Sequence, residues 1–395
     1  MTERKGTPDF FLLFMTILLV GFGIVMVFSA SGPEAAYEFG DALQYTKKQI
    51  IAGGLGIVLM FILMNIPFGF WRKGYIPFFF GVVALLVIVL FIPTTGNRPN
   101  SWIDLGFFSI QPAEFAKLAI ILYLASLITK KGENFESFKK GLLPVALIVG
   151  LVAGLIAKQP DYGSTFVFLC VSAIVIITGG ARLRHLALGI AALAVAAFFV
   201  LGGSLLGYQL NRFQCFFDPW QDPQNACWQH VQAQMAFGHG GVTGAGFGQS
   251  VQKLFYLPEA QNDFIFAIIG EELGFIGTSL FLMLYLLFLW RGIIVSLRCP
   301  DLFGTLIGIG VIGMFGIQAF INIGGVTGAI PMTGITLPFI SYGGSSLLVS
   351  LMSMGILLNV SRTSSPAFAS KVSEPKRGRG LKQSKIPEHV PKIRS

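Results

Sequence analysis

Charged residues are scarce in this chain, at 12% of its 395 residues, while hydrophobic residues make up 54%. A soluble domain carries about 25% charged residues, so the composition excludes an ordinary water-soluble fold. The lipid bilayer must therefore be the main solvent for this sequence. The 48 glycines and 38 phenylalanines are typical of packed membrane helices, in which small residues let two backbones approach closely.

Several chemical signatures are also missing. The sequence has no Walker phosphate-binding loop and so shows no ATP-driven step. It has no cluster of Cys and His with zinc spacing, and we expect no organic cofactor. Of the four cysteines, Cys170 and Cys299 fall in or beside apolar runs and are expected to be inert packing residues. Cys215 and Cys227 share one long segment, where a disulfide and two free thiols fit the sequence equally.

Long apolar runs dominate what is present. A membrane-spanning helix needs about 20 apolar residues. The first run is too long for a cleaved signal segment, so we expect it to be retained as a span. The sequence predicts an all-α polytopic membrane protein with ten transmembrane helices, at roughly 10–30, 49–66, 76–93, 112–129, 142–158, 163–180, 185–206, 264–290, 303–324 and 343–361.

The placement of Lys and Arg predicts the orientation of these spans. With an even number of spans, both termini share one side of the membrane. That side carries 21 of the Lys and Arg residues and the opposite side carries 6, so we expect both termini in the cytoplasm. The one long loop, between spans seven and eight, is then extracytoplasmic. The asymmetry also accounts for the net charge of +9, and nucleic-acid binding is not needed to explain it.

The sequence divides into a membrane domain at 1–361 and a basic tail at 362–395. The tail is rich in Lys, Arg, Ser, Gly and Pro and has little to bury, so we expect it to be disordered. It either binds anionic lipid or serves as a solvated linker.

Polar motifs gather on the predicted extracytoplasmic side. Trp102 follows span three, either as an aromatic residue of the membrane interface or as a platform for a ligand. Glu114 and Lys117 follow Pro112 at the start of span four, and their spacing puts them on one helical face. Charges inside a span must be mutually satisfied, so this pair either locks helices together or shapes a polar cavity.

Further candidates lie in the loops. Lys158 and Asp161 flank a turn with Pro and Gly, which is either only a turn or also faces an anionic ligand. The long loop carries Arg212, Gln232 and a glycine-rich stretch at 238–248. Such a stretch is a flexible loop by default, although its backbone amides could also approach a phosphate.

The segment 257–266 places two carboxylates, Glu259 and Asp263, at the lip of span eight. If the helix begins near Pro258, both carboxylates lie on one face within its first turns. They either serve the helix end and its dipole or form a reaction centre. Burial beside Phe264 would raise the pKa of Asp263 and make its carboxylate a usable base.

The last three spans also contain polar groups. Glu271 and Glu272 lie inside span eight and must face protein or water. In span nine, Gln318 and Asn322 are expected to form hydrogen bonds between helices. The segment 330–346, which includes Ser341, has two prolines and a Gly pair, so we expect irregular backbone that lines a cavity.

Six motifs follow one another along the chain: Trp-Ile-Asp-Leu-Gly at 102–106, Gln-Pro-Ala-Glu at 111–114, Gln-Pro-Asp-Tyr-Gly at 159–163, the segment 257–266, Gly-Glu-Glu-Leu-Gly at 270–274 and the segment 337–346. In this order they resemble the motifs of the SEDS family (shape, elongation, division and sporulation), which includes FtsW, RodA and SpoVE. The resemblance covers all ten predicted spans and is stronger to FtsW and SpoVE than to RodA.

The resemblance implies a peptidoglycan glycosyltransferase that polymerises lipid II at the outer face of the cytoplasmic membrane. It implies a class B penicillin-binding protein as partner, which crosslinks the new glycan, and other proteins of division or elongation. It also implies that Asp263 is the aspartate needed for activity, and that Trp102, Glu114 and Lys117 matter for function or stability.

Some neighbours of these residues depart from the family pattern. Gln261 and Asn262 stand where His-Thr is common, Ser101 stands where an Arg commonly precedes the tryptophan, and Ala113 stands where Ser is more usual. The carboxylate of Asp263 is retained, so these departures weaken only the roles assigned to the neighbours.

The implied reaction needs a base for the acceptor hydroxyl and a cation for the leaving diphosphate. Asp263 is the candidate base. Candidates for the diphosphate are a divalent cation (Mg or Mn) with unknown ligands and the side chains of Arg212, Lys253 and Lys158. Gln232, Glu259 and Ser341 are further candidates for the cavity.

Two rival functions use the same features. A lipid II flippase would also need broken helices and intramembrane charges, and a scaffold that activates a synthase would need no catalytic carboxylate. The clustering of polar motifs on the outer side favours chemistry there over transport.

Overall fold

The computed structural model describes residues 6–92, 101–104, 106, 109–181 and 208–363. The predicted seventh span at 185–206 and the tail beyond residue 363 lie outside the described residues. Within them the chain forms eleven α-helices, two short helical turns and one pair of two-residue strands. The expected all-helical class is therefore confirmed, with a minimal β-hairpin added.

The helices follow the apolar runs of the sequence. Their bounds are α1 Phe10–Phe39, α2 Gln44–Asn65, α3 Phe68–Val89, α4 Pro112–Lys131, α5 Leu143–Ala157, α6 Tyr162–Thr178, α8 Tyr208–Phe217, α9 Trp228–Gly240, α10 Ile265–Leu297, α11 Leu302–Val326 and α12 Gly344–Thr363. The short turns are η1 Gly132–Glu136 and η2 Phe138–Leu142, and the strands are β1 Ile103–Asp104 and β2 Ser109–Ile110.

Among the described residues, seven helices are long and apolar enough to cross a membrane: α1, α2, α3, α4, α10, α11 and α12. Two shorter apolar helices, α5 and α6, occupy the predicted runs at 142–158 and 163–180 with 15 and 17 residues. The structure thus confirms several long apolar helices, and the count of ten spans stays a prediction.

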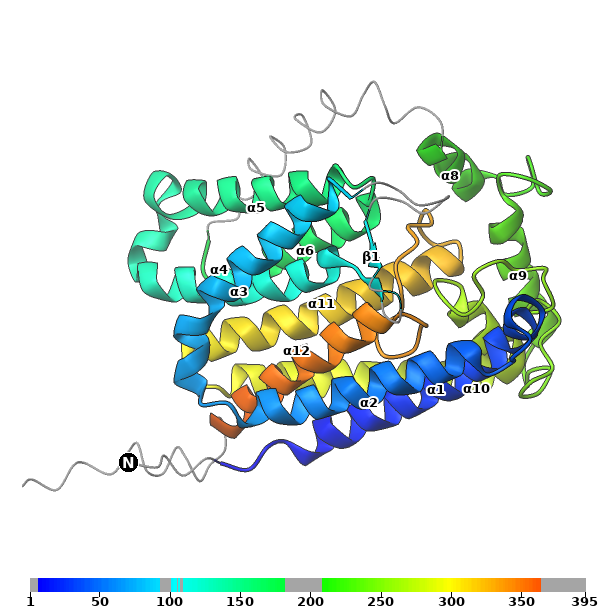
Figure 1. Cartoon of the computed structure of the whole chain (residues 1–395), viewed down its shortest axis with the longest axis horizontal. Coiled ribbons are helices and arrows are strands. Elements are labelled where there is room, and N and C mark those ends of the chain that lie inside the picture. Colours follow the sequence, from blue (N-terminus) through cyan, green and yellow to red (C-terminus); the bar gives the residue numbers. More distant parts are fainter. Residues whose placement is uncertain (1–5, 93–100, 105, 107–108, 182–207, 364–395) are drawn as a thin grey trace, which may run out of the picture.

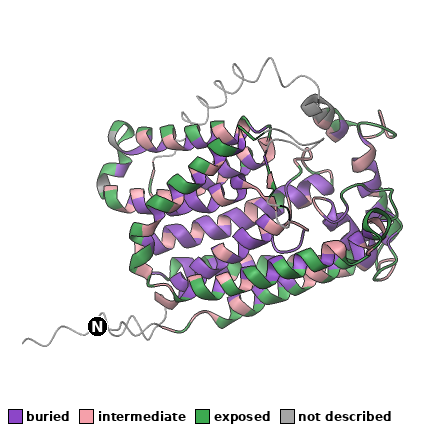
Figure 2. Cartoon of the chain, in the orientation of Figure 1, coloured by how far each residue is buried: buried purple, intermediate pink, exposed green. Residues whose placement is uncertain are grey.

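The long helices form one bundle whose interior is built from α4, α11 and α12 (Figure 1). Figure 2 shows buried residues along these helices and many exposed residues along α1, α2 and α5. The exposed positions are largely apolar, as at Phe80, Phe275 and Leu286. A soluble protein rarely leaves such continuous apolar surface in water, so these outer faces are suited to contact lipid.

Helices α8 and α9 lie at one end of the bundle, on the right in Figure 1, which we call the site end. The segment between α11 and α12 folds back into the bundle beside α1. A methyl group placed on Gly23 of α1 would lie 2.2 Å from the carbonyl oxygen of Phe339. Only a residue without a side chain allows this close approach, so Gly23 helps to fix the inserted segment.

Candidate active site

The two carboxylates of the 257–266 segment lie before a helix and not on it. The predicted span at 264–290 agrees with α10, which begins at Ile265, so the alternative start near Pro258 is not adopted. Glu259 adopts a left-handed backbone conformation with φ of 57°, which interrupts any helix there. Glu259 is exposed, while Asp263 is partly buried where the turns meet α10.

The backbone around Asp263 is fixed by hydrogen bonds from distant segments. The side-chain amide of Asn322, on α11, donates to the carbonyl oxygens of Asp263 and Ile335, each at 2.7 Å. The backbone N–H of Tyr342 donates to the carbonyl of Gln261 at 2.8 Å. Sequence reasoning gave Asn322 only a general role between helices, so its part in holding Asp263 was missed.

The structure brings Arg212 of α8 to the same place. A methyl group placed on Gly334 would lie 3.6 Å from Oδ2 of Asp263 and 3.9 Å from a guanidinium nitrogen of Arg212. Arg212 also donates to the carbonyl oxygen of Met332 at 3.2 Å. The carboxylate and the guanidinium therefore both lie close to Gly334, which has φ of 72° and no side chain.

The surroundings of Asp263 raise the pKa of its carboxyl to about 6. Burial is the largest cause, because it removes the water that stabilises the charged form. The negative charge of Glu259 adds to the increase, whereas the backbone N–H of Asp263 and the positive charge of Arg212 oppose it. Asp263 is thus ionised at neutral pH but more basic than an ordinary aspartate.

Ser341 is part of the inserted segment, where its hydroxyl accepts from the backbone N–H of Leu337 at 2.8 Å. Gln49 of α2 holds the same turn on both sides. Its side chain donates to the carbonyl of Ser341 at 3.0 Å and accepts from the N–H of Gly343 at 3.3 Å. Ser341 therefore shapes the turn beside the Asp263 loop, and Gln49 is a residue that sequence reasoning missed.

Three motifs of the sequence meet beside α12. Trp102 directly precedes β1 and is 36% exposed. The side chain of Gln111 donates to Asp161 at 2.8 Å, and Asp161 in turn accepts from the N–H of Ser164 at the start of α6 at 2.9 Å. Asp161 thus joins the α4 and α6 ends, while Lys158 is exposed at the end of α5.

Glu114 and Lys117 form the expected pair on α4, with 2.6 Å between Nζ and Oε1. Their side chains are only 9% and 1% exposed, respectively. A buried ammonium needs a partner of opposite charge, so each group depends on the other. This ion pair explains how two charged side chains can be buried in one helix.

Lys253 lies in a different environment from the one that the sequence led us to expect. Its ammonium is 2.9 Å from Glu272 of α10 and donates to Ser29 of α1 at 3.1 Å. Ser29 also donates to Glu272 at 2.6 Å. All three are buried. The charge of Lys253 is therefore engaged inside the protein, which argues against a direct role at a diphosphate.

Glu271, the residue before Glu272, anchors the glycine-rich stretch at 238–248 and the residues that follow it. It accepts hydrogen bonds from the hydroxyl of Ser250 and from the N–H of Val251, the latter at 2.9 Å, and it lies 2.8 Å from Nδ1 of His239. The stretch itself approaches α10 where that helix breaks at Gly274. A methyl group on Gly274 would lie 2.1 Å from the nitrogen of Gly244, so these glycines serve close backbone packing.

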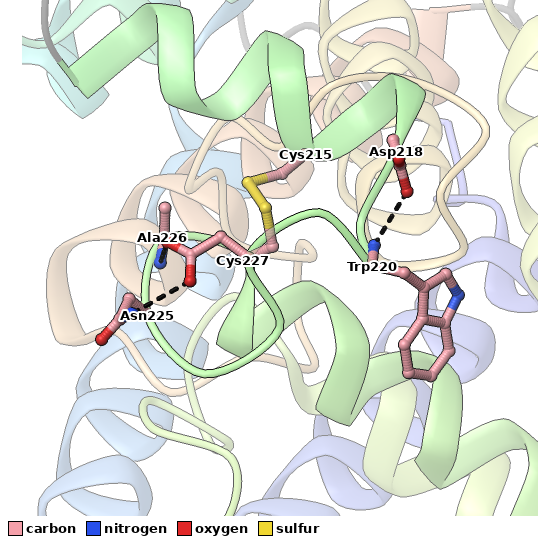
Figure 3. Close-up of a disulfide and its surroundings, with 7 residues drawn as sticks. Cys215, Asp218, Trp220, Asn225, Ala226 and Cys227 are labelled. Carbon is pink, nitrogen blue, oxygen red and sulfur yellow. Dashed lines mark hydrogen bonds between the residues drawn. A yellow bond between two sulfur atoms is a disulfide. The ribbon is translucent and has the colours of Figure 1, made fainter.

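The long loop contributes α8, α9 and the bridge between them. Cys215 and Cys227 form a disulfide in the structure, with a separation of 12 residues (Figure 3). Gln232 is buried on α9. Of the other cysteines, Cys299 is buried and Cys170 is partly buried, and neither is in a disulfide.

The candidate residues therefore separate into groups. Asp263, Arg212 and Glu259 belong to one electrostatic centre, whereas Lys253 belongs to another. Within the described part of the chain, no group of three or more His, Cys, Asp and Glu side chains is arranged to hold a metal ion. A carboxylate base facing a guanidinium is suited to proton transfer coupled to departure of an anion.

Comparison with known proteins identifies the family. Residues 10–366 match the FtsW, RodA and SpoVE family, described as cell cycle proteins, and the chain belongs to this family. The chain is 45% identical to stage V sporulation protein E of Bacillus subtilis, over 92% of this chain and 100% of that protein. It is 41% identical to a probable peptidoglycan glycosyltransferase FtsW of Trichlorobacter lovleyi, over 91% and 94% of the two chains.

Solved structures have the same fold. A chain from a structure described as a peptidoglycan synthase complex that coordinates polymerization and crosslinking matches with a TM-score of 0.73 and 31% identity. The match covers 90% of this chain and 98% of that chain. The rod shape determining protein RodA of Thermus thermophilus matches with a TM-score of 0.64 and 29% identity, over 90% and 97% of the two chains.

Proposed function

We propose that this protein is a peptidoglycan glycosyltransferase that polymerises lipid II. The observation that carries the proposal is the carboxylate of Asp263, with its raised pKa, beside the guanidinium of Arg212. The names of the relatives support the activity, since one is a probable peptidoglycan glycosyltransferase and a structural neighbour belongs to a peptidoglycan synthase complex.

In the proposed reaction, a sugar hydroxyl of the acceptor attacks the anomeric carbon of the donor. The new glycosidic bond forms as the bond from that carbon to the diphosphate oxygen breaks, and undecaprenyl diphosphate leaves. Asp263 takes the hydroxyl proton as general base. Arg212 stabilises the negative charge that develops on the diphosphate, a role for which a planar guanidinium with several donors is well suited.

We further propose that the site faces the outer side of the cytoplasmic membrane. The Lys and Arg distribution supports this orientation, because it assigns the termini to the cytoplasm and the site end to the opposite side. A class B penicillin-binding protein is the proposed partner, together with other division or elongation proteins. The likeness to a synthase complex with polymerising and crosslinking activities supports such a partner.

A flippase and a scaffold are the alternatives to be tested. Purified protein in vesicles with labelled lipid II allows polymer formation and lipid II translocation to be measured on the same sample. We expect polymer to form on the side of the vesicle membrane that the site end faces. Translocation without polymer would favour the flippase. Neither activity from the protein alone, with polymer formed only when a separate synthase is added and more of it than that synthase makes by itself, would favour the scaffold.

The pH dependence of polymerisation should follow the ionisation of the Asp263 carboxyl. Because the base must be ionised, activity should rise as pH increases through about 6. Glu259 raises the pKa of Asp263, so Glu259→Gln should lower that pKa and move the midpoint to lower pH. Glu38→Gln, which removes another exposed carboxylate, should leave the midpoint where it is. An unchanged or higher midpoint in Glu259→Gln would argue against Asp263 as the titrating base.

A divalent cation is proposed as a companion of the substrate. Magnesium commonly binds through one or two carboxylates together with substrate phosphates, so a complete protein site is not required. We therefore expect a chelator to lower polymerisation and added Mg or Mn to restore it. The melting temperature of the substrate-free protein should not change, because the described residues form no metal cluster. A lower melting temperature after chelation would instead indicate a structural metal.

A further inference from the structure

Helix α8 carries both the cationic residue of the site and one half of the disulfide. Arg212 and Cys215 are three positions apart, so they lie on neighbouring parts of one helical face. Cys227, the other half, is the residue directly before α9. The disulfide therefore joins α8, which carries Arg212, to the residue that immediately precedes α9 (Figure 3).

The turn between the two cysteines has internal support of its own. Asp218 accepts a hydrogen bond from the backbone N–H of Trp220 at 3.1 Å. Asp222 accepts from the side chain of Asn225 at 2.9 Å and from the N–H of Ala226 at 3.2 Å. Figure 3 shows these contacts on either side of the disulfide. Because the turn is braced, the bridge can set the position of α8 relative to α9.

A covalent link and a hydrogen bond connect α8 to the site. The disulfide joins Cys215 of α8 to Cys227, and Arg212 donates to the carbonyl oxygen of Met332 at 3.2 Å. Loss of the covalent link, three positions from Arg212, should therefore loosen α8 and shift the guanidinium relative to Asp263.

A small cavity of about 100 Å³ lies where these parts meet. A typical site for a small molecule measures roughly 300–1,000 Å³, so this cavity suits one compact group and not a sugar ring. The polar groups of Arg212, Gln229 and His230 line it. Burial lowers the pKa of His230, which leaves Arg212 as the cation. The remaining wall consists of Cys215, Ala226, Phe264 and Met332.

We propose that the cavity is a subsite for a phosphate group of a lipid-linked diphosphate, and that the Cys215–Cys227 bridge is the positioning element that holds Arg212 there beside Asp263. This inference rests on the proposed glycosyltransferase function, because it identifies the part of that site that takes the diphosphate. It makes binding of the substrate dependent on the oxidation state of one cysteine pair.

Binding can be measured without turnover, which separates this inference from the proposed function. The probe is undecaprenyl diphosphate, with inorganic diphosphate as a second arm that tests whether the headgroup alone suffices. Its affinity is compared in four full-length proteins: the parent, Arg212→Gln, Cys215→Ala/Cys227→Ala, and the variant with all three substitutions. A double-mutant cycle then shows whether the bridge acts through Arg212.

A hydrogen bond to a charged group corresponds to roughly a tenfold change in affinity or more. We expect Arg212→Gln and the double cysteine variant each to weaken probe binding by about that factor, with no further loss when they are combined. Independent losses that multiply in the triple variant would overturn the positioning role. Parent-like binding by the folded double cysteine variant would overturn it as well.

Reduction of the parent protein provides a test that needs no substitution at the bridge. A phosphine reductant should weaken probe binding by the parent, with Cys170→Ala/Cys299→Ala as matched control that keeps this sensitivity. The protein without Cys215 and Cys227 should not respond. Equal binding before and after verified reduction of the bridge would contradict the inference, whether or not the protein polymerises lipid II. A loss of polymerisation in the parent under all conditions would instead contradict the proposed function.

Discussion

Asp263→Asn should abolish measurable polymerisation while the protein still folds and binds lipid II. A general base contributes roughly 10²- to 10⁴-fold to a reaction, and an amide of the same shape cannot take the proton. Asn322 and Tyr342 hold the backbone of this loop through the carbonyls of Asp263 and Gln261, so the substitution leaves these contacts in place. The rate of polymer formation at saturating lipid II is the measurement.

Folding should not limit this variant. The raised pKa of Asp263 means that the folded protein disfavours its charge relative to the unfolded chain. The unfavourable contribution grows as pH rises from the ordinary aspartate range through about 6, and the neutral amide removes it. We therefore expect a melting temperature at pH 7 equal to or above that of the parent.

An exposed carboxylate provides the matched control. Asp41 lies in the turn between α1 and α2 and pairs with Lys47 at the surface. Asp41→Asn should polymerise lipid II at a rate close to that of the parent. Near-parental activity of Asp263→Asn, or equal losses in the two variants, would rule out the assignment of the base.

Lys117→Ala should produce the largest loss of stability of the substitutions considered. Removing one partner of a buried ion pair costs about 3 to 5 kcal/mol, because the other charge stays buried without compensation. In Lys117→Ala the buried carboxylate of Glu114 would lose its partner, since it lies 2.6 Å from the ammonium of Lys117. The free energy of unfolding in detergent, or the melting temperature, measures the effect.

Two comparisons distinguish a structural pair from a substrate contact. Replacing both charges, as Glu114→Gln/Lys117→Met, should recover much of the lost stability because no buried charge remains. Lys47→Ala breaks an exposed pair and should cost no more than about 1 kcal/mol. A Lys117→Ala protein that is inactive but as stable as the parent would mean that Lys117 contacts the substrate directly.

The sequence was most informative where the determining interactions are local. Apolar length alone predicted the helices α2, α3, α4, α10, α11 and α12. The spacing of Glu114 and Lys117 predicted their pair, because positions three apart on a helix must be neighbours. Helix α1 extends beyond the predicted end at residue 30, through Pro33, to Phe39, and Gly40 follows in a left-handed conformation. Membrane helices tolerate such a proline where neighbouring segments satisfy the backbone.

The geometry of the site depends on contacts between distant segments, and the sequence could not predict it. Asp263 and Arg212 are 51 positions apart, and both side chains lie close to Gly334. Pro258 is compatible with a helix start, but the left-handed Glu259 prevents one, so the alternative placement of both carboxylates on one helical face is wrong. The pairing of Lys253 with Glu272 could not be predicted either, because nothing in the local sequence indicates it.

Purified protein, alone in detergent with lipid II and without a partner protein, tests the central claim most directly. We expect glycan chains longer than the starting disaccharide, which a muramidase digests, and release of undecaprenyl diphosphate in step with bond formation. Unchanged lipid II after prolonged incubation of a folded preparation that binds this substrate would contradict the claim that the protein itself is the polymerase.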